Sequence, residues 1–282
     1  MKKMFALAAF AVLLLGSGAA FGAEWTEYEN SLALGVLQIR LESRSQADER
    51  SALDWLTQKR AEFFSSIKEG QVCDEAKLSL ENLFAVELYH YMWELAPTAK
   101  ATDKFILEQF DKTVAWNNSH PVDSRNEWYS LSAYEVINTA MPLIKYSKKI
   151  SFGLEEKNVY DSLIDAKCDK GLLYLNAGLW HAFAPAIGGG RDSKAKEYFL
   201  TAAKIGPSGF EKFFGYVYLS QMEFRRGGFD AALPFLAEAD KISPGNVYTE
   251  FVRRMNRAGC DIFEYANDRE GVDAKARKFY KK

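Results

Sequence analysis

The sequence predicts an all-α protein of about a dozen helices, arranged as a right-handed helical repeat. Apolar residues recur at spacings of three and four over most of the chain, which is the period of an amphipathic helix. In the C-terminal half, one helix–turn–helix pattern also occurs twice, with matching positions 37 residues apart. Units of this kind stack so that each one covers apolar surface of the next.

The first 22 residues have the three parts of a signal peptide. Residues 1–3 are a short basic start, residues 5–15 are apolar, and Ala20 and Gly22 are small at the positions that a signal peptidase reads. The apolar run is shorter than a transmembrane helix requires. We therefore expect cleavage near Gly22 and a periplasmic or secreted protein, with an uncleaved membrane anchor as the alternative.

Charge argues against nucleic acid as a partner. Removing Lys2 and Lys3 from the 36 basic residues leaves 34 against 38 acidic residues, a net charge of −4. Nucleic-acid-binding domains usually carry a clustered basic patch, and no basic run is present here. Because no other apolar segment reaches transmembrane length without a charge, we also expect no integral membrane segment in the mature chain.

Residues 23–167 are predicted to form an N-terminal, repeat-like helical region. Pro97 should close its third helix, and Pro142 should kink or end the fifth. Val36 to Leu41 could also alternate as a strand, but the longer helical period is preferred. A basic connector is expected at 145–153. The predicted helices cover residues 25–41, 49–67, 74–95, 101–116, 126–144 and 154–166.

Two clearer repeat units are predicted within residues 168–246. In the second unit, Arg226-Gly227-Gly228 ends a first helix and Phe229 begins another, which Pro244 stops. Small residues on the inner faces should let the paired helices approach closely. These inner positions are Ser220, Ala232 and Ala239 in the second unit and Ala177, Gly178, Ala195 and Ala202 in the first.

The first unit matches the second at a constant offset and contains an insertion. Ala195 corresponds to Ala232 and Pro207 to Pro244, and both offsets are 37 residues. The insertion falls near residues 185–190, a Pro/Gly-rich stretch that we interpret as an inter-helix loop. After the repeats, residues 247–282 are expected to form one capping helix over 247–266 and a frayed basic tail from 271.

These residues resemble the tetratricopeptide repeat family, over about Gly171 to Asn246. Glu223 departs from the pattern, which usually has an aromatic residue there. An exported repeat protein with this insertion is also similar to the periplasmic accessory proteins of TRAP-type transporters, although no cysteine follows the signal peptide to carry a lipid. The resemblance implies that the first helix of each unit lines a concave binding face.

An apolar groove is therefore expected on that face. It would suit a partner's amphipathic helix, an apolar peptide or an elongated apolar ligand. The alternative is that the N-terminal helices fold over this face and bury it as core, because long exposed apolar patches are uncommon on monomers. The candidate groove residues are Leu172, Leu175, Leu179 and Ala182 in the first unit and Phe214, Val217, Gln221 and Phe224 in the second.

No catalytic, cofactor-binding or metal-binding residue is predicted. His90, His120 and His181 are too far apart in sequence to form a ligand motif with one another. The expected function is a non-catalytic scaffold that binds another envelope protein or peptide. The alternative function is an accessory protein of a TRAP-type solute transporter that binds a small hydrophobic ligand.

The three cysteines leave at least one thiol unpaired, because their number is odd. A disulfide between Cys73 and Cys168 is conceivable in an oxidising compartment, but the sequence cannot pair them. Buried or idle thiols at Cys73, Cys168 and Cys260 are the default expectation.

Overall fold

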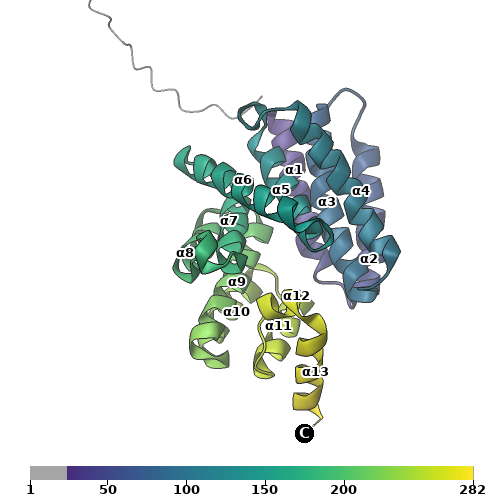
Figure 1. The fold of residues 1–282 in the computed structure, drawn as a ribbon. Coiled ribbons are helices and arrows are strands. Elements are labelled where there is room, and N and C mark those ends of the chain that lie inside the picture. Colours follow the sequence, from purple (N-terminus) through teal and green to yellow (C-terminus); the bar gives the residue numbers. More distant parts are fainter. Residues whose placement is uncertain (1–23, 282) are drawn as a thin grey trace, which may run out of the picture.

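The computed structural model describes residues 24–281, and in this range all regular structure is helical (Figure 1). The predicted signal peptide lies outside the described residues. None of the described helices is both long and apolar enough to span a membrane. The N-terminal helices are α1 (Glu27–Ser43), α2 (Glu49–Ser66), α3 (Asp74–Leu95), α4 (Lys100–Ser119), α5 (Glu127–Ala140) and α6 (Tyr146–Asp165). The C-terminal helices are α7 (Gly171–Phe183), α8 (Asp192–Ile205), α9 (Gly209–Gly227), α10 (Phe229–Ile242), α11 (Val247–Arg257), α12 (Ile262–Asn267) and α13 (Arg269–Tyr280).

The two predicted repeat units correspond to the helix pairs α7–α8 and α9–α10. Phe229 begins α10 as predicted, and Gly228 before it has a φ of 75°, a conformation that glycine adopts without strain. The small inner residues allow close packing: a Cβ added to Gly178 would lie 2.4 Å from the Phe199 ring. A Cβ added to Gly215 would lie 2.6 Å from the Ala203 nitrogen, so α8 and α9 are nearly in backbone contact there.

A shared cap joins the two units at their N-terminal ends. The Ser208 hydroxyl accepts a hydrogen bond from the Glu211 backbone N–H at 3.2 Å, which caps α9. One Glu211 carboxylate oxygen accepts from the Ser208 N–H at 2.9 Å, and the other accepts from the Leu172 N–H at 2.8 Å. One buried carboxylate therefore satisfies backbone donors at the starts of both α7 and α9.

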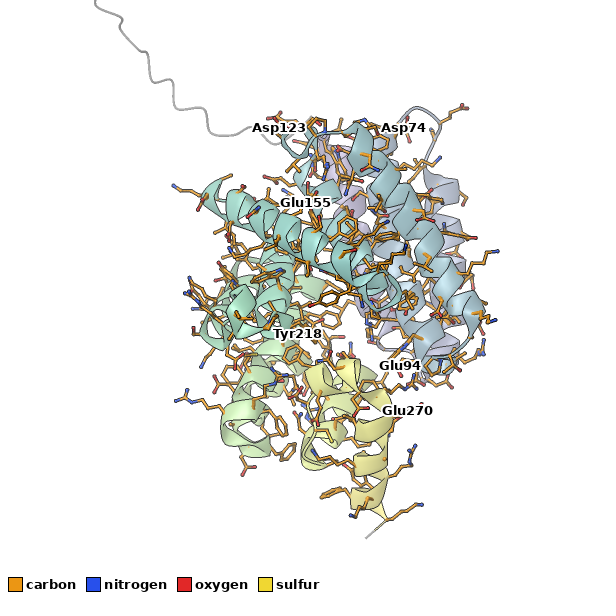
Figure 2. The ribbon with its side chains drawn as sticks, viewed as in Figure 1. Asp74, Glu94, Asp123, Glu155, Tyr218 and Glu270 are labelled. Carbon is orange, nitrogen blue, oxygen red and sulfur yellow. The ribbon has the colours of Figure 1, made fainter. Side chains whose placement is uncertain are left out.

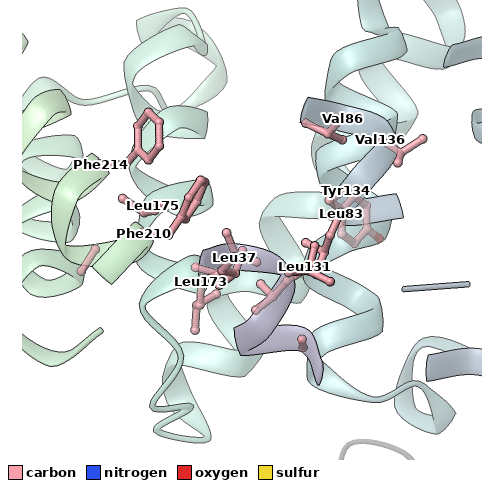
Figure 3. Packing of buried hydrophobic residues seen from close by; sticks show 14 of the residues in the cluster. Leu37, Leu83, Val86, Leu131, Tyr134, Val136, Leu173, Leu175, Phe210 and Phe214 are labelled. Atoms are coloured by element: carbon pink, nitrogen blue, oxygen red, sulfur yellow. The ribbon is translucent and has the colours of Figure 1, made fainter. Parts of the chain in front are cut away.

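One hydrophobic core runs through the N-terminal helices and the repeat units. Helix α1 packs against α3 and also against α9, so the first helix of the chain covers the second repeat. Leu37 of α1 is fully buried, and Figure 3 shows it where Leu131 of α5 and Leu173 of α7 converge. A second, small cluster joins α11, α12 and α13 through Met255, Cys260, Tyr265 and Val272.

Three predicted element boundaries were wrong. Helix α6 begins at Tyr146, so residues 146–153 are helical and not a connector. The single helix expected over 247–266 is two helices, because the chain turns at Gly259, where φ is 77°. The tail expected to fray is helix α13, and the Asp268 side chain caps its first turn by accepting from the Gly271 N–H at 3.0 Å.

Helix α13 is held in place by hydrogen bonds to distant residues, which the spacing of apolar residues in the sequence does not reveal. The Arg269 guanidinium donates to the carbonyl oxygens of Trp93 and Glu94, both at 2.8 Å. Lys275 donates to the Gly259 carbonyl oxygen at 2.7 Å. The two bonds from Arg269 satisfy carbonyls at the end of α3, a role that cationic side chains commonly fill at helix C-termini.

Candidate functional site

The face predicted to be an open groove is mostly buried. Five of its residues are in the core, namely Leu172, Leu175, Phe214, Val217 and Gln221, whereas Leu179, Ala182 and Phe224 are half-buried. Helix α1 supplies part of the cover, since the Arg40 guanidinium lies 4.5 Å from the centre of the Phe210 ring. The structure therefore matches the alternative in which the N-terminal helices cover this face.

Gln221 has a structural partner in place of a ligand. Its side-chain amide pairs reciprocally with that of Asn256 on α11, with Nε2 to Oδ1 at 3.1 Å and Nδ2 to Oε1 at 3.0 Å. The Gln221 oxygen also accepts from the Ile262 backbone N–H at 3.3 Å. All three groups are buried, so this polar contact fixes α11 and α12 against the second repeat.

A buried charge network follows the covered face. Arg40 on α1 binds Glu135 on α5 through two hydrogen bonds, at 2.9 and 3.2 Å, and Glu87 on α3 at 3.3 Å. Arg44, one helical turn later, lies 2.5 Å from the other Glu87 oxygen. Burial raises the pKa of Glu87, but the two guanidinium groups outweigh burial and hold that pKa below its usual value.

Arg44 lies in a cage of aromatic rings at the C-terminal end of α1. Its guanidinium carbon is 5.1 Å from the centre of the Tyr91 ring, 4.9 Å from that of Tyr248 and 5.8 Å from that of Phe214. Such contacts stabilise a guanidinium cation through the negative faces of the rings. Burial lowers the pKa of Arg44, but Glu87 outweighs it and raises that pKa, so Arg44 stays charged.

A pocket of about 490 Å³ opens beside Arg44. It lies where the turn between α1 and α2 and the end of α3 meet α11 and the last residue of α13. Its walls combine rings and methyl groups with charged side chains of both signs. The lining residues are Ser43, Arg44, Gln46, Ala47, Asp48, Glu49, Ala52, Tyr91, Glu94, Val247, Tyr248, Glu250, Phe251, Arg254, Arg257 and Tyr280.

Glu94 links the pocket to the C-terminal helices, and Figure 2 shows it at the end of α3 facing them. Its carboxylate accepts a hydrogen bond from the Tyr265 hydroxyl at 2.8 Å and pairs with Arg269 at 3.3 Å. Burial raises the pKa of Glu94 despite these two partners. At the far wall, the Tyr280 hydroxyl donates to the Arg254 carbonyl oxygen at 2.8 Å, which holds α13 against α11.

The histidines lie apart from one another and outside the pocket lining. His90 is near the charge network, its residue is exposed to solvent, and its Nδ1 contacts the Val86 carbonyl oxygen at 3.3 Å. His120 stacks on Trp116 at 4.0 Å, and His181 packs between Trp180 and Tyr198. Within residues 24–281, no group of three or more His, Cys, Asp or Glu side chains could hold a metal ion.

All three cysteines are free thiols in the structure. Cys73 is exposed and precedes α3, where its sulfur accepts from the Ala76 N–H at 3.4 Å. Cys168 and Cys260 are buried, and burial raises the pKa of Cys168 to about 12.

Sequence reasoning missed this pocket because its walls come from four distant segments. One local indication was present: Arg40 and Arg44 are four residues apart at the end of an apolar helix, and Arg40 falls on its buried stripe. A buried arginine needs a carboxylate partner, which points to a network with other helices.

Comparisons with known proteins give one short similarity. Over 88 residues the chain is 34% identical to a DNA repair protein RecO from Oceanobacillus iheyensis. The matched part is 30% of this chain and 34% of that protein, so the chain spans about a third of the curated relative. No family model and no solved structure matches the chain.

Proposed function

We propose that the protein is a non-catalytic binding protein of the cell envelope, which captures a segment of another protein in the pocket beside Arg44. The observation that carries this proposal is the pocket itself, a cavity of about 490 Å³ with aromatic walls and charged side chains. Its volume falls within the range of about 300–1,000 Å³ that is typical of ligand sites. Since α1 already covers the repeat face, the pocket replaces that face as the site of recognition.

A second candidate is the accessory protein of a TRAP-type transporter, which would hold a small apolar molecule. The same volume favours this candidate, because a pocket of that size can enclose one small organic molecule as well as a short piece of peptide. Phe251, Val247 and Tyr280 provide the apolar contact area. The two candidates share the site and differ in the occupant.

The experiment is site-specific photo-crosslinking in the organism's own envelope. A photoreactive phenylalanine analogue replaces Val247, which lines the pocket and is 41% exposed, so the substitution leaves the core intact. The matched control carries the same analogue at Ile187, which is fully exposed and lies outside the pocket.

A defined protein cross-linked from Val247 and not from Ile187 supports the proposal. Native mass spectrometry of the purified protein tests the second candidate: a bound small apolar mass, displaced by Val247→Trp, would establish it. Equal cross-linking at the two positions would contradict a role of the pocket in recognition.

A further inference from the structure

The pocket contains guanidinium groups with hydrogen-bond donors that no other described residue uses. Arg44 uses Nε toward Glu87, and its two terminal nitrogens form no hydrogen bond with another described residue. Arg254 and Arg257 also line the pocket, and the contacts of their guanidinium groups within residues 24–281 are to rings, Phe251 at 5.9 Å and Phe229 at 5.2 Å. Neither forms an ion pair with a described carboxylate.

The acidic residues of the lining are mostly engaged. Glu94 binds Tyr265 and Arg269, and Glu250 pairs with Arg253. Asp48 accepts from the Ser51 backbone N–H at 2.7 Å, which caps α2. Glu49 remains at the exposed rim. The lining therefore holds two arginines without an ion pair to a described carboxylate, Arg254 and Arg257, and a third, Arg44, whose pair with Glu87 uses only Nε.

We propose that this pocket recognises a carboxylate carried on an apolar or aromatic body. This inference rests on the proposed function, because it names the chemistry that the same pocket selects. The edge of a guanidinium group matches a carboxylate with two parallel hydrogen bonds. The cage of Tyr91, Tyr248 and Phe214 holds the Arg44 guanidinium in one orientation before the ligand arrives, which lowers the entropy cost of binding.

The apolar walls and the surrounding acidic residues restrict the chemical class of the ligand further. Phe251, Val247 and Ala52 offer apolar surface beside the basic groups, so the carboxylate should be attached to an apolar group. Glu49, Glu94 and Glu250 surround the same space and would repel a dianion more than a monoanion. A singly charged carboxylate therefore fits this pocket better than a phosphate ester.

The test uses a pair of probes that differ only in charge. The mature protein is titrated with 3-phenylpropionate and with 3-phenylpropanamide, and binding is followed by ligand-observed NMR and by the shift in Tm. We expect the acid to bind at least about tenfold more tightly than the amide, since an arginine–carboxylate contact is charge-assisted. Added salt should weaken binding of the acid and leave binding of the amide unchanged.

Three variants test which arginines cause the preference for the acid. Arg254→Gln with Arg257→Gln changes two exposed side chains that make no ion pair with a described residue, so the fold should be retained while acid binding weakens. Arg44→Gln should abolish the preference for the acid, with helical circular dichroism as its control. Arg226→Gln, an exposed arginine of α9 outside the pocket, should bind both probes as the parent does.

Equal binding of the acid and the amide, or no binding of the acid at its solubility limit, would overturn the inference. The proposed function would survive that result if Val247 still cross-links a defined protein. Conversely, a preference for the acid without any cross-linked protein would support the carboxylate inference and contradict the proposal that the pocket captures another protein.

Discussion

Arg40 on α1 and Glu135 on α5 form a bidentate ion pair, with nitrogen–oxygen distances of 2.9 and 3.2 Å, although they are 95 residues apart in sequence. The Arg40 side chain is 4% exposed, so the pair is formed almost without water. Together with Glu87, it fixes the position of α1 between the N-terminal bundle and the repeat units. The same position of α1 places Arg44 at the pocket.

Arg40→Met should therefore destabilise the protein strongly. It would leave Glu135 and part of Glu87 without their cation in a buried setting, and breaking a buried pair from one side costs about 3–5 kcal/mol. The matched control is Lys104→Met, whose exposed pair with Glu108 should contribute less than about 0.5 kcal/mol. Urea denaturation of both variants measures the difference. Similar midpoints for the two variants would show that the network does not hold α1.

The second prediction concerns Gly215, where α8 and α9 pack closely. An added Cβ would lie 2.6 Å from the Ala203 nitrogen and 2.9 Å from the Phe199 carbonyl oxygen, so α8 and α9 must separate in Gly215→Ala. We expect a loss of about 2 kcal/mol or more in the free energy of unfolding.

The control for Gly215→Ala is Gly153→Ala in α6. No described atom beyond the adjacent residues and the backbone of the same helix lies within 4 Å of its added Cβ, and alanine favours a helix over glycine by up to about 1 kcal/mol. This variant should be as stable as the parent or more stable. We therefore expect Gly215→Ala to lower Tm and Gly153→Ala to leave it unchanged or raise it. An unchanged Tm for Gly215→Ala would contradict the close approach of α8 and α9.

The repeat helices could be predicted from the sequence because the residues that define each helix face lie close together in the chain. The spacing of Ala232, Leu236 and Ala239 specifies one inner face, and all three are fully buried. What covers Leu172 and Phe214 was not predictable, since an apolar helix face looks the same whether a partner or the chain's own α1 packs on it. The pocket was equally hidden, because Arg44, Tyr91 and Tyr248 come from three helices and carry no motif. Only the three-dimensional arrangement brings them together.

Thiol reactivity provides a third prediction. N-ethylmaleimide should modify native protein once, at exposed Cys73, and three times after denaturation, because Cys168 and Cys260 are buried. Intact-mass spectrometry counts the adducts. Cys73→Ser should remove the native adduct and keep the helix start, since serine is a favourable N-cap. A mature protein that is two hydrogens lighter and gains a single adduct on denaturation would instead contain a disulfide.

The last prediction concerns Glu156, a carboxyl group buried between α5 and α6. Burial raises its pKa to about 7, and its main polar contact is the Asn138 side-chain amide, which donates to it at 2.6 Å. In the unfolded chain the pKa returns to about 4.5. The folded state therefore binds the proton more tightly, so the free energy of unfolding falls as pH rises from about 4.5 to about 7.

Glu156→Gln should remove this pH dependence, because glutamine is neutral and can still accept from Asn138. Relative to the parent, the variant should be nearly neutral at pH 5 and more stable at pH 8, by up to about 3 kcal/mol for a shift of this size. Glu29→Gln is the control of opposite sign. The hydrogen bonds from Cys73 and Thr26 lower the pKa of Glu29 despite the opposing effect of burial, so its contribution is lost as pH falls. Urea unfolding at pH 5 and pH 8 measures Glu156→Gln, and unfolding at pH 3 and pH 5 measures Glu29→Gln, because the contribution of Glu29 changes only below the usual carboxyl pKa of 4.5. A Glu156→Gln effect of equal size at pH 5 and pH 8 would mean that Glu156 keeps its charge in the folded protein.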